Sequence, residues 1–272
     1  MSTTTQELSK QQTKGASANK GTFGWYELMT TDPAAAKTFY SSVVGWTTAD
    51  VGSSEMAYST FNLGNAGVAG LMKLPRDAGP TPAWIGYIHV DNVDTYAKKV
   101  ADAGGKIHKA PTDVPGMLRF SVVMDPQGAP FVLFTPDPKM PTPSNRPNPG
   151  DVGTVSWHEL MATDGPKALD FYSKLFGFKP TTSMDMGPMG QYQMFASEGE
   201  QAIGGIMTKP PEAPSPFWNY YIQVDNITAA RDRVKKGGGS ILREPQEVPG
   251  GQWILQAKDP QGAFFCLVSN NK

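Results

Sequence analysis

Hydrophobic and polar positions alternate over residues 24–30, the pattern of a half-buried β-strand. The alternation stops at Asp32-Pro33, where Asp suits a helix N-cap and Pro suits the first helical position. Apolar residues then recur at helical spacing over residues 34–44, and Gly45 predicts the end of that helix. Two short strands are predicted to follow, around residues 56–63 and 69–74.

The same order of elements then begins again. Residues 84–90 are predicted to form a strand, and Asp91-Asn92-Val93 opens a helix that Gly104-Gly105 ends. Three strands are predicted to complete the segment, near residues 106–109, 118–124 and 130–134. The segment therefore contains two βαβββ units.

The whole segment is duplicated. The run Trp25-Tyr26-Glu27-Leu28-Met29 returns in the second half of the chain as Trp157-His158-Glu159-Leu160-Met161. The Asp-Pro-Gln-Gly turn that starts at Asp125 returns at Asp259, at almost the same offset. A match held over this distance indicates a tandem repeat, so we expect an α+β protein built from four βαβββ units.

The flanking segments set the predicted boundaries. Residues 1–20 are polar and carry no export signal, so they are predicted to be a disordered tail. A proline-rich linker over residues 137–152 is predicted to separate a first module, 21–136, from a second, 153–270. A cytoplasmic location is the prediction, and secretion without a leader peptide stays open.

Composition narrows the classes of partner. The 272 residues include 24 Lys and Arg against 25 Asp and Glu, whereas nucleic-acid binding favours a basic excess. No apolar run approaches the roughly 18 residues that cross a bilayer. The single cysteine, Cys266, excludes an internal disulfide framework. A small-molecule ligand, with no nucleic acid and no membrane, is the predicted partner.

The duplicated runs resemble the vicinal oxygen chelate superfamily of glyoxalases, bleomycin-resistance proteins and extradiol dioxygenases. The resemblance lies in Asp32…Phe39-Tyr40…Gly45-Trp46, in its second copy from Asp164 to Phe178, and in the Asp-Pro-Gln-Gly turns. The Trp-x-Glu-Leu openings are similar in particular to a two-module bacterial group of glyoxalase-like and hydroxylase-like proteins that includes a mycobacterial secreted antigen. The resemblance implies two curled mixed sheets, each around a cavity that in many members holds a divalent metal.

The metal-ligand positions that this resemblance implies carry other residues here. They fall on Trp25 and Trp157, on Ile85 and Asn219, and on Val132 and Cys266. None is His or Glu, whereas divalent ions of this kind favour imidazole and carboxylate donors. The prediction is that the usual metal site and its cofactor are absent, with a non-standard divalent metal left open.

The inward face of the first strand supplies the leading candidates for chemistry. Alternation places Trp25, Glu27 and Met29 on one face. A buried carboxyl tends to a raised pKa, so Glu27 and its counterpart Glu159 are candidate general bases, although each could simply fix the fold through a neighbouring tyrosine. The predicted ligand-binding residues are Trp25, Met29, Tyr87, Trp157, Met161, Asn219, Tyr221 and Gln223.

The three histidines are expected to have different roles. His89 shares the inward face with Tyr87 and is a third candidate catalytic residue, or else a hydrogen-bonded wall residue. His158 faces away from Glu159 and is expected to pack against a helix, and His108 is expected to be solvated. Methionines 184, 186 and 189 suggest either core filling or a mobile lid.

Two functions remain from these patterns. The first is a protein that binds a small apolar or aromatic molecule in Trp-walled cavities. The second is a superfamily enzyme, a lyase, isomerase or hydroxylase-type catalyst, that uses Glu27 and Glu159. Cavities could form within a module or between modules, and because the chain already contains two modules a monomer is predicted.

Overall fold

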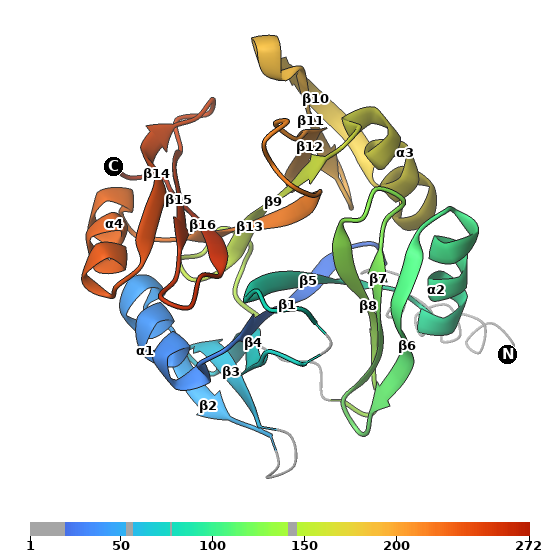
Figure 1. The fold of residues 1–272 in the computed structure, drawn as a ribbon, viewed down its shortest axis with the longest axis horizontal. Helices are drawn as coiled ribbons and strands as arrows, with labels where there is room; N and C mark the ends of the chain where they lie inside the picture. Colours follow the sequence, from blue (N-terminus) through green and yellow to red (C-terminus); the bar gives the residue numbers. More distant parts are fainter. Residues whose placement is uncertain (1–19, 53–56, 77, 141–145) are drawn as a thin grey trace, which may run out of the picture.

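The computed structural model describes residues 20–52, 57–76, 78–140 and 146–272. Two eight-stranded mixed sheets, one per module, form the molecule, and the helices lie on their outer surfaces (Figure 1). The predicted disordered tail lies outside the described residues except for Lys20. No helix in the described part of the chain is long and apolar enough to cross a membrane.

The elements of the first module follow the predicted order, except that the strand after the first helix, at residues 47–50, was not among the predicted ranges. They are β1 (Phe23–Thr30), α1 (Pro33–Val44), β2 (Thr47–Asp50), β3 (Tyr58–Leu63), β4 (Ala66–Lys73), β5 (Ala83–His89), α2 (Val93–Asp102), β6 (Lys106–Val114), β7 (Leu118–Met124) and β8 (Pro130–Pro136). The strand order is β2-β3-β4-β1-β5-β8-β7-β6, so the first strands of the two units pair at the centre of the sheet.

The second module repeats this order. Its elements are β9 (Val155–Ala162), α3 (Gly165–Phe176), β10 (Lys179–Asp185), η1 (Gly187–Met189), β11 (Gln191–Ala196), β12 (Gly204–Thr208), β13 (Phe217–Gln223), α4 (Ile227–Lys236), β14 (Ser240–Glu247), β15 (Trp253–Lys258) and β16 (Phe264–Ser269). The strand order is β10-β11-β12-β9-β13-β16-β15-β14. The predicted α+β fold with two repeated modules is confirmed.

Local chemistry explains the helix ends. The Asp32 side chain accepts from the backbone N–H of Ala35, and Gly45 ends α1 with φ of 91°, a left-handed conformation that favours glycine. Strand β6 is longer than predicted, because it continues past Pro111 to Val114. Because β6 is an edge strand, a proline without an N–H group is tolerated there.

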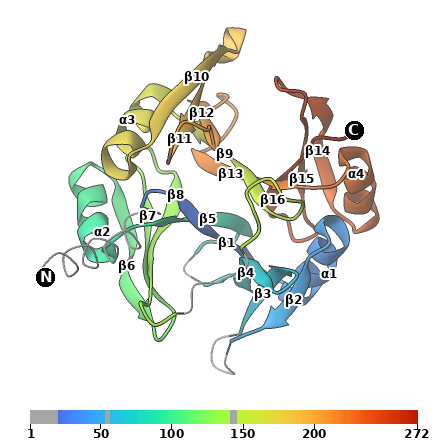
Figure 2. The same ribbon diagram turned by 180° about the vertical axis from the view of Figure 1, so that it is seen from behind.

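The two largest hydrophobic cores are each shared by both modules. One core joins α1 and β4 of the first module to α4 and β16 of the second, and the other joins α2 and β8 to α3 and β9. Figures 1 and 2 show the result, with α1 beside α4 and α2 beside α3. The modules therefore depend on each other for the burial of their apolar surface.

The residues that carry the family resemblance hold the modules together. Trp84 donates to Tyr40 Oη (2.9 Å), and Tyr40 donates across the module boundary to Asp259 (3.2 Å). The second copy does the same from Trp218 through Tyr172 to Asp125, at 3.0 Å and 3.3 Å. These buried chains connect a helix of one module to a turn of the other.

The centre of the boundary is aromatic. His158 stacks on Phe23 with ring centroids 4.3 Å apart and accepts from the Tyr26 hydroxyl at 2.6 Å. The Tyr220 hydroxyl accepts from the backbone N–H of Gly86 at 2.7 Å. His158 was expected to pack against a helix; it instead lies between the modules, because the outer face of β9 meets the first strand of the other module.

Candidate functional site

Each sheet has a second, inner face, and the candidate residues lie there. In the first module this face carries Ile85, Tyr87, Val132 and Phe134, with half-buried Trp25, Met29, Leu118, Phe120 and Val122 packed against them. In the second it carries Tyr221, Cys266 and Val268, with Trp157, Ile254 and Phe264. Each cluster consists of residues from one module.

Glu27 lies at the centre of the first site and is buried. The Tyr87 hydroxyl donates to its Oε1 atom at 3.1 Å, and Tyr58 forms a second hydrogen bond with the carboxyl. Trp25 in turn donates from its indole N–H to the Tyr58 hydroxyl at 3.2 Å. Four side chains from β1, β3 and β5 therefore form one connected polar group in an apolar surround.

The second site repeats this arrangement and extends it. Tyr192 donates to Oε1 of Glu159 at 3.2 Å, while Tyr221 donates to Oε2 at 3.0 Å. Trp157 donates to the Tyr192 hydroxyl at 2.8 Å, as Trp25 does to Tyr58. Asn219 adds a bond that the first module lacks, from its amide to Oε2 at 3.0 Å.

The hydrogen bonds that each tyrosine oxygen accepts determine where its hydroxyl proton points. An indole N–H can only donate, so the oxygen of Tyr192 accepts from Trp157 and its own proton is left to bond to Glu159. Gln256 donates to the Tyr221 hydroxyl at 3.2 Å, with the same consequence for that tyrosine. The site is therefore organised to present donors to a carboxylate.

Two glycines make room for the tyrosines. Gly70 pairs with Glu27, and Gly205 pairs with Glu159, each on the neighbouring strand. A Cβ atom at Gly70 would lie 1.9 Å from the Tyr58 hydroxyl, and one at Gly205 would lie 2.2 Å from the Tyr192 ring. Each tyrosine crosses the sheet over a glycine to reach its glutamate.

Burial and hydrogen bonding act on the carboxyls in opposite directions. Burial raises the pKa of Glu27 above its usual value, while hydrogen bonds from Tyr58 and Tyr87 lower it. Burial also raises the pKa of Glu159, and the bonds from Asn219, Tyr221 and Tyr192 oppose that rise. In both cases burial is the larger effect.

The remaining predicted residues lie on or near the inner face. Met29 and Met161 are half-buried on their strands, and His89 is half-buried with its ring 5.5 Å from that of Phe134. Gln223 is buried and accepts from the Ser156 hydroxyl at 3.2 Å. Their contribution to ligand binding and catalysis stays a prediction.

The side chains around the glutamates differ from the ligands of the divalent metal that the fold implies. Among the described residues, no three His, Cys, Asp or Glu side chains come together. The carboxyl of Glu27 is next to Ile85 on the paired strand, and its hydrogen bonds come from tyrosine hydroxyls. This set does not fit a site made of imidazole and carboxylate ligands.

The predictions from sequence did not include several residues that surround the two glutamates: Tyr58, Tyr192, Gly70, Gly205 and Gln256. The repeat contained a signal for some of them, because Tyr58 and Tyr192 are related by the same offset as the two Asp-Pro-Gln-Gly turns. The methionine prediction also needs correction: Met189 is 52% exposed at the tip of the β10–β11 hairpin and fills no core.

Comparison with known proteins gives a consistent result. The family model described as Glyoxalase/Bleomycin resistance protein/Dioxygenase superfamily matches residues 22–133 and 154–267. The chain is 31% identical over 259 residues to "Putative glyoxylase CFP32" of Mycobacterium tuberculosis, covering 94% of this chain and 97% of that protein. It is 30% identical over 263 residues to the anthracycline biosynthesis protein DnrV of Streptomyces peucetius, covering 91% and 93%.

A solved structure shows the same fold. The Mn(II)-bound glyoxalase from Novosphingobium aromaticivorans superposes with a TM-score of 0.64 at 18% identity, covering 93% of this chain and 83% of that one. At this identity the likeness concerns the fold alone.

Proposed function

Because this chain belongs to the glyoxalase/bleomycin resistance protein/dioxygenase superfamily, we propose that each module binds a small apolar or aromatic molecule on its inner face. The observation that carries the proposal is the buried Glu–Tyr–Trp group, which lies among aromatic and aliphatic side chains in both modules. Small-molecule sites commonly combine an apolar wall with a few fixed polar groups.

The similarity to an anthracycline biosynthesis protein supports an aromatic ligand, since anthracyclines contain fused planar rings. The half-buried indoles of Trp25 and Trp157 supply flat apolar surface at equivalent places. The tyrosine hydroxyls are held by their indole and carboxyl partners, so the wall is ordered before a ligand arrives.

A neutral fluorescent probe tests the proposal. N-phenyl-naphthylamine should bind with a stoichiometry of two per chain, and Trp25→Leu or Trp157→Leu should each remove one site. Trp253→Leu is the matched control, because Trp253 packs against a core on the opposite side of its sheet. An unchanged stoichiometry in the Trp25→Leu/Trp157→Leu double variant would contradict the proposal.

The second candidate function is catalysis by a superfamily enzyme of the lyase, isomerase or hydroxylase type. It is favoured by the two buried carboxyls, whose raised pKa values suit a general base. Glu27→Gln and Glu159→Gln are then expected to abolish turnover and leave ligand affinity nearly intact. Equal loss of turnover and affinity would leave the glutamates as binding residues only.

We also propose that the chain works as a monomer, in which the two modules take the place of two subunits. Size-exclusion chromatography with light scattering should give a mass near 29.3 kDa. A stable dimer would contradict this proposal.

A further inference from the structure

The inner face of each module also carries a positive charge at its edge strand. Lys109 on β6 pairs with Val122 on β7, and Arg243 on β14 pairs with Gln256 on β15. Residues directly opposite each other in an antiparallel pair extend from the same face of the sheet. Val122 packs in the first inner cluster and Gln256 bonds to Tyr221, so both cations belong to the inner faces.

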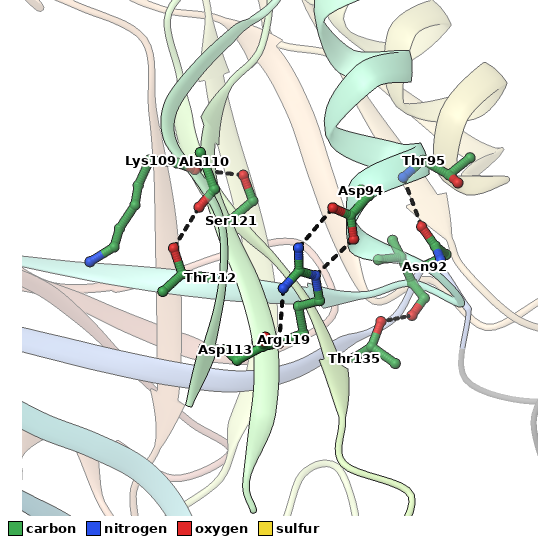
Figure 3. Close-up of polar contacts among 11 residues, drawn as sticks. Asn92, Asp94, Thr95, Lys109, Ala110, Thr112, Asp113, Arg119, Ser121 and Thr135 are labelled. Atoms are coloured by element: carbon green, nitrogen blue, oxygen red, sulfur yellow. Dashed lines mark hydrogen bonds and ion pairs between the residues drawn. The ribbon is translucent and has the colours of Figure 1, made fainter. Parts of the chain in front are cut away.

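Lys109 lies across the wall of the first site. Its Nζ atom is 5.3 Å from the ring centroid of Phe120, which packs in the same inner cluster. Figure 3 shows the side chain extending away from α2, whereas Arg119 on the next strand reaches toward Asp94 on that helix. The ammonium group therefore lies at the rim of the inner face.

Arg243 occupies the equivalent position in the second repeat, at the offset that also relates Asp125 to Asp259. One of its guanidinium nitrogens donates to Gln246 at 2.9 Å on the same edge strand. The positive charges act on the buried glutamates. Lys109 lowers the pKa of Glu27 and Arg243 lowers the pKa of Glu159, and each effect is smaller than that of burial.

Neither cation is in a salt bridge with a described residue. The contrast with Arg119 is direct, because that guanidinium bonds to Asp94 through two nitrogens and to Asp113 through a third (Figure 3). Both Lys109 and Arg243 are exposed, so a bound molecule can reach them. The presence of a cation without an ionic partner at the same place in both repeats needs an explanation beyond solubility.

We propose that the ligand of each module is an aromatic molecule bearing an acid group, which pairs with Lys109 in the first module and Arg243 in the second. This inference rests on the proposed function, whose aromatic wall it extends with a second subsite. The cation at the rim attracts an acid group, so the acid end of the ligand points outward. Arg243 can bind a planar carboxylate through two nitrogens, which Lys109 cannot do.

A matched pair of fluorescent probes tests the inference. Anilinonaphthalene sulfonate and N-phenyl-naphthylamine share an arylamine skeleton and differ in the acid group. The sulfonate probe should bind the wild-type protein about tenfold more tightly, because hydrogen bonds to charged groups contribute at that level. In Lys109→Met/Arg243→Met this preference should disappear while affinity for the neutral probe stays within about twofold.

The control variant is Lys98→Met/Lys236→Met, which removes the same charge from the outer helices α2 and α4. It should keep the preference, and added salt should weaken the preference in the wild-type protein. Circular dichroism and the thermal midpoint show that each variant is folded.

The outcomes separate the two proposals. If the neutral probe binds but the sulfonate adds nothing, or if the preference survives in Lys109→Met/Arg243→Met, the acid subsite is refuted and the aromatic wall stands. If the control variant loses the preference equally, the effect is one of net charge and the inference is overturned. If neither probe binds the wild-type protein, the proposed function fails together with its extension.

Discussion

Acidification is expected to weaken the boundary between the modules through His158. This imidazole is buried, and its Nδ1 atom lies 2.8 Å from the Ile203 carbonyl oxygen. A carbonyl can only accept, so Nδ1 carries the proton and Nε2 accepts from Tyr26. Burial disfavours the charged imidazolium, so His158 is neutral in the folded protein, and protonation would place a charge among aromatic rings.

The size of the effect follows from the pKa. Burial lowers the pKa of His158 from 6.5 to about 4. Between those values the unfolded chain binds a proton that the folded protein does not, so stability is lost as the pH falls through this window. The difference corresponds to a loss of about 3 kcal/mol, which is complete only about one pH unit below the folded-state pKa and is absent above about pH 7.5.

Urea unfolding at a series of pH values measures this loss when the wild-type protein is compared with His158→Phe. The phenyl ring keeps the stacking on Phe23 but cannot titrate. The hydrogen bonds lost in His158→Phe therefore lower the free energy of unfolding by the same amount at every pH. The buried carboxyls titrate in both proteins, and their contributions cancel in the difference. The wild-type advantage should shrink by about 2 to 3 kcal/mol between about pH 7.5 and pH 4.5.

A difference that stays constant within about half a kcal/mol over that range would refute the reasoning. It would mean that His158 is solvated or protonated in the folded protein. A wild-type advantage that grows on acidification would show that the imidazolium gains a partner in the boundary.

Two further predictions concern the polar chains. Gly205→Ala should displace the Tyr192 ring, alter Trp157 fluorescence and lower the free energy of unfolding by about 1 to 3 kcal/mol. This loss should vanish when the same change is made in Tyr192→Ala, and equal losses in both backgrounds would contradict the close approach of the Tyr192 ring to Gly205. Tyr172→Phe should lower the free energy of unfolding by about 1 to 3 kcal/mol, because it leaves buried Asp125 without its partner from the other module, and an unchanged urea midpoint would show that this bond contributes nothing.

The elements could be predicted because their signals are local. The helix that begins at Pro33 depends on Asp32, its own first turn and Gly45, and all three lie within a short window of sequence. The positions of Glu27 and Glu159 on an inner face also follow from strand alternation once the repeat is found.

The partners of those glutamates could not be predicted in the same way. Tyr58 reaches Glu27 from two strands away, across Gly70, and this path depends on a strand order that alternation does not specify. The place of His158 depends on how the second module meets the first, which is a property of the assembled molecule. The order of the strands and the way the two modules pack together therefore could not be predicted from the sequence.

The central contact between the modules has a consequence for the two repeats. Tyr26 and His158 occupy the same position in the two repeats, as do Gly86 and Tyr220, so each pair joins a residue to its own counterpart. A side chain as small as alanine at Gly86 would already lie 2.6 Å from the Tyr220 ring. Two copies of the second repeat would thus bring two tyrosines into space for one, and two copies of the first would leave that space empty. The two halves are therefore unequal partners at this contact, and neither can be replaced by a duplicate of the other without disrupting it.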